Sequence, residues 1–116
     1  MDSILLTIKK MLGIEIGFDG FDTDIIVNIN NAFMTLNQLG IGPTDCYSIT
    51  GIEELWSDFL ESSTNLESIK IYIYLKTRLA FDPPLNSFLV KAIETQVSEL
   101  EWRLNTQIEF NTTTVV

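Results

Sequence analysis

The sequence contains no histidine and a single cysteine, Cys46. Histidine is the side chain that most often serves as a general base near neutral pH and as a metal ligand. One cysteine cannot form a disulfide within the chain, and without histidine it has no partner for a cysteine–histidine nucleophile. These absences remove the commonest hydrolytic and metal-dependent chemistries, so we expect no enzyme and no cofactor.

Basic residues are also scarce. The chain has 7 lysines and arginines against 16 aspartates and glutamates, a net charge of −9 over 116 residues. Binding to nucleic acid requires clustered positive charge, because phosphates supply most of the affinity. The sequence therefore excludes a DNA-binding role more firmly than a role beside DNA.

Long apolar runs are absent, although 46% of the residues are hydrophobic. A membrane-spanning helix needs about 20 apolar residues in a row. The apolar start of the chain has Lys9 and Lys10 after it instead of before it, so we interpret it as a helix and not a signal peptide. This length and composition predict one globular domain with its own core and no membrane partner.

Periodicity predicts an all-α fold, a small bundle of four to five helices with short loops and a flexible C-terminal tail. Residues 1–106 would form the domain and residues 107–116 the tail. Asp2 or Ser3 would cap the first helix and Asp22 the second, with Phe21 and Ile26 as a hydrophobic staple. The predicted helices cover residues 3–12, 22–39, 53–60, 66–81 and 87–106, with apolar stripes such as Leu89, Ile93, Val97, Leu100 and Leu104 in the last.

The segment after the polar break at residues 62–65 is ambiguous, because isoleucines alternate with Lys70, Tyr72 and Tyr74 as they would in a strand. Its apolar pattern continues to Phe81, which exceeds the usual strand length. Asn65 is placed to cap a helix, and Asp82-Pro83-Pro84 would end it. We therefore predict a helix that is apolar nearly all round and central to the bundle.

The sequence contains no motif that indicates a catalytic or ligand-binding site. Asp19, Asp22 and Asp24 lack the ligand spacing of a calcium loop, so capping and solubility account for them. The adjacent or alternate carboxylates Glu53 with Glu54 and Glu99 with Glu101 do not face each other on a helix. We interpret them as a solvated acidic surface. The spacing of the glycines does not match a phosphate-binding loop. We interpret Cys46 as a small hydrophobic residue that is buried or half-buried.

Two tryptophans are candidates for binding a partner, because this residue dominates many interfaces. Trp56 fits the core better. Trp102 falls one step off the apolar stripe of the last helix, at its edge, where a core role and an interface role are both open. We take Trp102, with Arg103 and Phe110, as the candidate partner or oligomer interface.

Several stretches together resemble the phage and prophage head–tail connector proteins, also called adaptor or head-completion proteins. These stretches are IKKMLGIE, NINNAFMTLNQLGIGP, ITGIEELWSDFL, IKIYIYLKTRLAFDPP and SELEWRLN. The resemblance covers residues 1–106, and its most specific part is FDPP followed by ELEWRLN. The tail lies outside it.

The resemblance implies a virion structural protein at the head–tail junction, made in the host cytoplasm. Subunits would form a ring of about twelve beneath the portal protein. The ring would contact the stopper or tail-completion protein, and genomic DNA would pass through without specific binding. The family has no catalytic, cofactor or metal residues to carry over. Absence of a sustained heptad predicts a monomer before assembly.

Two other functions remain open from the residues alone. One is a small helical protein–protein interaction module outside the virion. The other is an enzyme that uses carboxylates.

Overall fold

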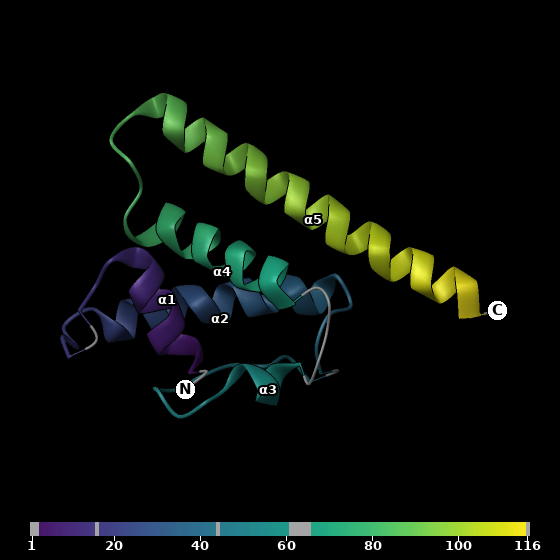
Figure 1. Cartoon of the computed structure of the whole chain (residues 1–116), viewed down its shortest axis with the longest axis horizontal. Coiled ribbons are helices and arrows are strands. Elements are labelled where there is room, and N and C mark those ends of the chain that lie inside the picture. The colour runs from purple at the N-terminus through teal and green to yellow at the C-terminus, as the bar shows by residue number, and fades with distance from the viewer. Residues whose placement is uncertain (1–2, 16, 44, 61–65, 116) are drawn as a thin grey trace.

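The computed structural model describes residues 3–15, 17–43, 45–60 and 66–115, with no side chains described from residue 107 onward. The predicted caps Asp2 and Asn65 and the predicted polar break at residues 62–65 lie outside these ranges. Five helices follow one another along the chain: α1 (Ile4–Leu12), α2 (Asp22–Gln38), α3 (Trp56–Phe59), α4 (Leu66–Phe81) and α5 (Ser87–Val115) (Figure 1). The all-α prediction is confirmed.

The helix α4 is the centre of the bundle, as its sequence predicted. It packs against α1, α2 and α5, and its buried residues include Ile69, Tyr72 and Ile73. In Figure 1, α5 lies along one side of α4 and α2 along the other. A segment with neighbours on several sides needs apolar residues around most of its circumference, which explains why its pattern also resembled a strand.

The junction between α1 and α2 differs from the predicted capping. Ser3 caps α1 as expected, by accepting a hydrogen bond from the Leu6 amide at 3.3 Å. Asp22, however, is the first residue of α2 and not its cap, and the residue before it makes no side-chain cap. The Asp22 carboxylate instead lies 2.8 Å from the ammonium of Lys9, whose side chain is only 2% exposed. The charge of the buried Lys9 explains this difference, because a buried ammonium requires a partner.

The helix α3 is shorter than predicted and begins at Trp56 instead of Glu53. Asp58 accepts a hydrogen bond from the Leu55 amide at 2.9 Å, which fixes this start. Trp56 is buried, and its indole donates to the Thr7 hydroxyl at 3.1 Å, so its predicted core role is confirmed.

The helix α5 begins at Ser87 as predicted but continues beyond Thr106 to Val115. Asn86 caps it by accepting from the Phe88 amide at 2.7 Å. Its buried residues are Ile93, Val97 and Leu104, whereas Leu89, predicted for the same stripe, is 54% exposed. Among the described helices, α4 alone makes an extensive contact with α5, so one apolar stripe is enough to hold α5 on the bundle. The proposed division of the chain at residue 106 stays a prediction.

Candidate functional site

The outward face of α5 contains the most prominent candidate residue, Trp102, whose side chain is 66% exposed. A helix turns about 100° per residue, so Trp102 lies nearly opposite Ile93 and far from the stripe that contacts α4. The sequence pattern had placed it at the edge of the helix. A tryptophan so exposed to solvent contributes little to the packing of the fold.

The two other predicted interface residues have different outcomes. Arg103 is beside Trp102 and exposed, and its guanidinium lies 3.3 Å from the Glu99 carboxylate, the ion pair expected from their spacing. An exposed pair of this kind contributes little to stability. Phe110 belongs to α5, but its side chain is outside the described part of the chain. The structure therefore brings Trp102 and Arg103 together and leaves Phe110 untested.

A polar contact fixes the rotation of α5 on α4. The Tyr72 hydroxyl donates a 2.7 Å hydrogen bond to Glu101, and the ammonium of Lys76 lies 4.0 Å from the same carboxylate. Burial, together with the nearby Glu101 charge, raises the pKa of Tyr72 well above its usual value. Because Trp102 follows Glu101 directly, this contact holds the indole on the far side of α5 from α4.

A second surface feature is a depression that we call the α2–α4 groove. Its Phe81 end has a volume of about 420 Å³ and is lined by both polar and apolar residues: Phe21, Asp24, Val27, Asn28, Ala80 and Phe81. It continues along the two helices past Asn31, Lys76 and Leu79. The residues that α2 contributes recur at three- and four-residue steps, so they form one helix face, away from the buried Ile25 and Ile29.

Aromatic rings form part of the lining at the Phe81 end of this groove. Phe21 packs edge-on against Phe18 at 5.3 Å and against Phe81 at 5.2 Å between ring centroids. Phe21 and Val27 remain 44% and 54% exposed. The sequence had assigned Phe21 to a capping staple and gave no sign of the groove, because Phe81 comes from a helix distant along the chain.

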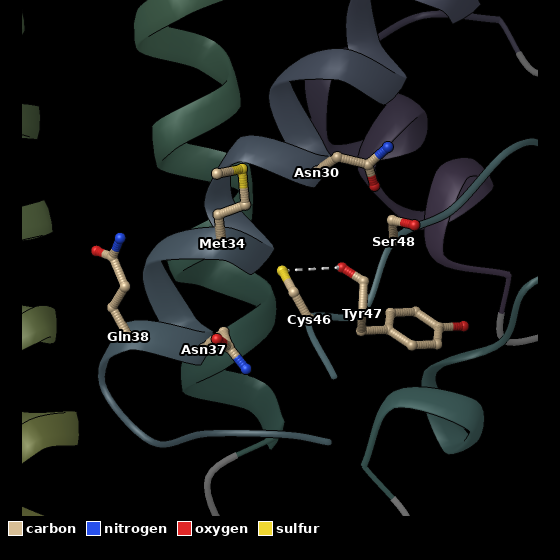
Figure 2. Close-up of a pocket in the computed structure, with 7 residues that line it drawn as sticks. All are labelled: Asn30, Met34, Asn37, Gln38, Cys46, Tyr47 and Ser48. Carbon is tan, nitrogen blue, oxygen red and sulfur yellow. Dashed lines mark hydrogen bonds between the residues drawn. The ribbon is translucent and has the colours of Figure 1, made fainter. Parts of the chain in front are cut away.

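Another hollow borders α2 and is lined by side chains without formal charge. Figure 2 shows it between α2 and the segment around Cys46, lined by Asn30, Met34, Asn37, Gln38, Cys46, Tyr47 and Ser48. The Cys46 side chain is exposed, so the prediction that it is buried or half-buried was wrong. The reason is that Tyr47, its neighbour, fills the core position, with its ring 5.2 Å from that of Phe33.

An asparagine forms the wall of that hollow. The Asn30 amide donates to the Ile49 carbonyl at 3.0 Å and accepts from the Ile49 amide at 2.8 Å. It therefore holds the segment before α3 against α2 by satisfying two backbone groups. Asn30 therefore has a structural role in α2.

Within the described ranges, no three acidic, cysteine or histidine residues are grouped so that they could hold a metal ion. Among the aspartates near the start of α2, Asp22 forms an ion pair with Lys9. Among the described helices, none combines the length and the apolar character needed to cross a membrane.

Residues 4–111 match a family model described as Phage connector protein, a range that runs from the start of α1 into the last turns of α5. No curated protein and no solved structure matches the chain.

Proposed function

Because the chain belongs to the phage connector protein family, we propose that it is a subunit of a ring of about twelve copies beneath the portal. Its general role is that of a structural protein of the phage head–tail junction. In the proposal, the ring bridges the portal protein to the stopper or tail-completion protein and lines the channel for genomic DNA. The subunit is made in the host cytoplasm and is a monomer before it assembles.

The observation that carries this proposal is the family match over residues 4–111, which includes α1 to α4 and most of α5. Two properties of the chain support it. The net charge of −9 suits the wall of a channel, because an acidic surface does not retain DNA as it moves past. The described part of the molecule also offers exposed apolar surface on α5 and α2, which an isolated monomer leaves uncovered.

We further propose that Trp102, Arg103 and Phe110 form an interface with a partner or with another subunit. The exposure of Trp102 and its position on the outward face of α5 support this. Tryptophan and arginine are the residue types most enriched among the side chains that dominate binding energy. A helix that is held to the body on one side only presents such residues without disturbing the core.

Native mass spectrometry of the purified chain, alone and mixed with the portal of the same phage, tests the proposal. We expect a mass near 13.2 kDa for the free chain and the addition of about a dozen copies to the portal ring. A chain that stays at its monomer mass in both samples would contradict the connector role and favour a helical interaction module outside the virion. A ring-forming phage protein other than the portal, tested in its place, is the control for non-specific binding.

A further inference from the structure

We propose that α5 is a hinged arm, which leaves α4 and returns to it while α1 to α4 remain folded. The contact of Glu101 with Tyr72, which we call the latch, holds the arm in its docked position. Three features of the chain support this motion: the narrow attachment of α5, the construction of the turn before it and the latch itself. The motion takes place within one chain, so it does not depend on the connector role.

The attachment of α5 to the rest of the molecule is narrow. Its buried side chains are Ile93, Val97 and Leu104, with Leu100 partly buried beside them. These residues recur at three- and four-residue steps, so they form one stripe, and that stripe meets α4. In Figure 1 the C-terminal half of α5 projects beyond the other helices. A helix with so few apolar contacts belongs to the part of a fold that opens most easily.

The core of the bundle is built without α5. The rings of Phe33 and Phe59 pack with their centroids 4.7 Å apart, and the Trp56 indole donates to the Thr7 hydroxyl at 3.1 Å. These contacts join α1, α2 and α3, and α4 also packs against α1 and α2. Departure of α5 therefore uncovers one side of α4 and leaves the contacts among the other helices in place.

The turn between α4 and α5 completes each helix separately. The Asp82 amide donates to the Arg78 carbonyl at 2.8 Å, at the end of α4. Asn86 accepts from the Phe88 amide at 2.7 Å, so the start of α5 is capped by a residue next to it. Leu85 lies between the two helices, fully exposed and without a hydrogen bond to any other described residue. Its backbone can rotate without breaking a hydrogen bond or uncovering apolar surface, as a hinge requires.

The latch joins the two helices near the middle of the stripe. Glu101 accepts a 2.7 Å hydrogen bond from the buried Tyr72 and lies 4.0 Å from the ammonium of Lys76. A hydrogen bond to an ionised group is stronger than one between neutral groups, and opening of the arm breaks it. Trp102 follows Glu101 directly, so a partner that turned the indole to another direction would have to break the latch as well.

Native-state hydrogen exchange of the full chain, read for each amide by NMR at increasing urea concentration, tests the arm. We expect amides of residues 93–104 to exchange through an opening that occurs more often than global unfolding, which controls the buried amides of α2. The urea dependence of this opening should lie between two limits. Fraying of a helix exposes little surface and gives almost none, whereas global unfolding gives the largest.

Three variants separate opening of the arm from global unfolding. Glu101→Ala should raise the exchange rate of the α5 amides about tenfold, because it removes the hydrogen bond to Tyr72. Glu99→Ala is the matched control, since it removes an exposed carboxylate two residues away, and should change the rate by less than about twofold. Ile8→Val removes a buried methyl group from α1, so it should raise the rate in α2 about fivefold and leave α5 unchanged.

Four results would overturn the inference. If α5 and α2 amides exchanged through one opening with equal urea dependence, or if Ile8→Val accelerated both equally, α5 would unfold only with the core. Exchange in α5 without any urea dependence would show fraying and no arm. Equal α5 rates for Glu101→Ala and Glu99→Ala would refute the latch. Circular dichroism of each variant checks that the fold is retained.

Discussion

The buried ion pair between Lys9 and Asp22 gives a sharp prediction about stability. It joins the end of α1 to the first residue of α2, and the Lys9 ammonium also donates a 2.6 Å hydrogen bond to the Phe18 carbonyl. Lys9→Met keeps most of the aliphatic chain and removes the ammonium, with both its charge and its hydrogen bond to Phe18. The substitution therefore separates the contribution of the ammonium from the packing of the aliphatic chain.

The expected loss follows from the burial of the two groups. The Lys9 side chain is 2% exposed and that of Asp22 is 23% exposed. Removing one partner of a fully buried pair costs about 3–5 kcal/mol, because the other charge is left without compensation. Asp22 keeps some contact with water, so we expect the lower end of that range, about 3 kcal/mol.

Urea unfolding followed by circular dichroism measures this loss. For a slope of about 1.5 kcal/mol per molar urea, the midpoint should fall by about 2 M. Lys10→Met is the matched control, because Lys10 is the neighbouring lysine and is exposed. This substitution should lower the free energy of unfolding by less than about 0.5 kcal/mol.

A double-mutant cycle tests whether the loss of the ion pair causes the loss of stability. Asp22→Asn alone leaves the ammonium buried without its carboxylate, so it should also destabilise the fold. The combined Lys9→Met and Asp22→Asn chain should then lose less than the sum of the two single losses. A loss under about 1 kcal/mol for Lys9→Met, or an additive cycle, would refute the reasoning.

Two further predictions concern α5 and the loop after α2. Tyr72→Phe should cost about 1 kcal/mol through the lost hydrogen bond to Glu101. Because folding raises the pKa of Tyr72, its hydroxyl stays protonated in the fold at a pH where the unfolded chain ionises. Wild-type stability should fall as pH rises above about 10, and thermal melts should show a smaller fall for the variant. Gly42→Ala should cost about 2–3 kcal/mol in urea unfolding, because φ is +90° and the new Cβ would meet the Phe59 ring at 2.5 Å. Gly13→Ala, at φ +83° with open space around it, should lower the free energy of unfolding by only about 1 kcal/mol. Equal losses for the two variants would count against a clash between the new Cβ at position 42 and Phe59.

The helices were predictable because their signals are local. Ser3 and Gly13 act on the nearest turns of α1, and proline after Asp82 stops α4 whatever surrounds it. The boundary of α5 was predicted less well, because no glycine or proline follows Thr106 to end the helix. Asp22 was misassigned because its capping chemistry is local, while its real partner, Lys9, is brought to it by packing.

The interface candidates were predictable only in part. Residue type singled out Trp102 and Arg103, and the structure shows that both are exposed on α5. Whether Trp102 faced the core depended on which stripe of α5 met α4, and the Tyr72–Glu101 contact settles that rotation. Cys46 was misplaced for a related reason, since either of two adjacent residues could have filled the core position that Tyr47 occupies.

The sequence by itself determined that this protein is helical, acidic and without histidine, and its motifs indicated the connector family. Those properties depend on residue type, periodicity and short-range spacing, which the chain displays before it folds. Only the tertiary structure decided where the surfaces lie: the burial of Lys9, the outward direction of Trp102 and the α2–α4 groove. The physical reason is that each of these requires contact between helices distant along the chain, and such contact depends on how the whole core packs.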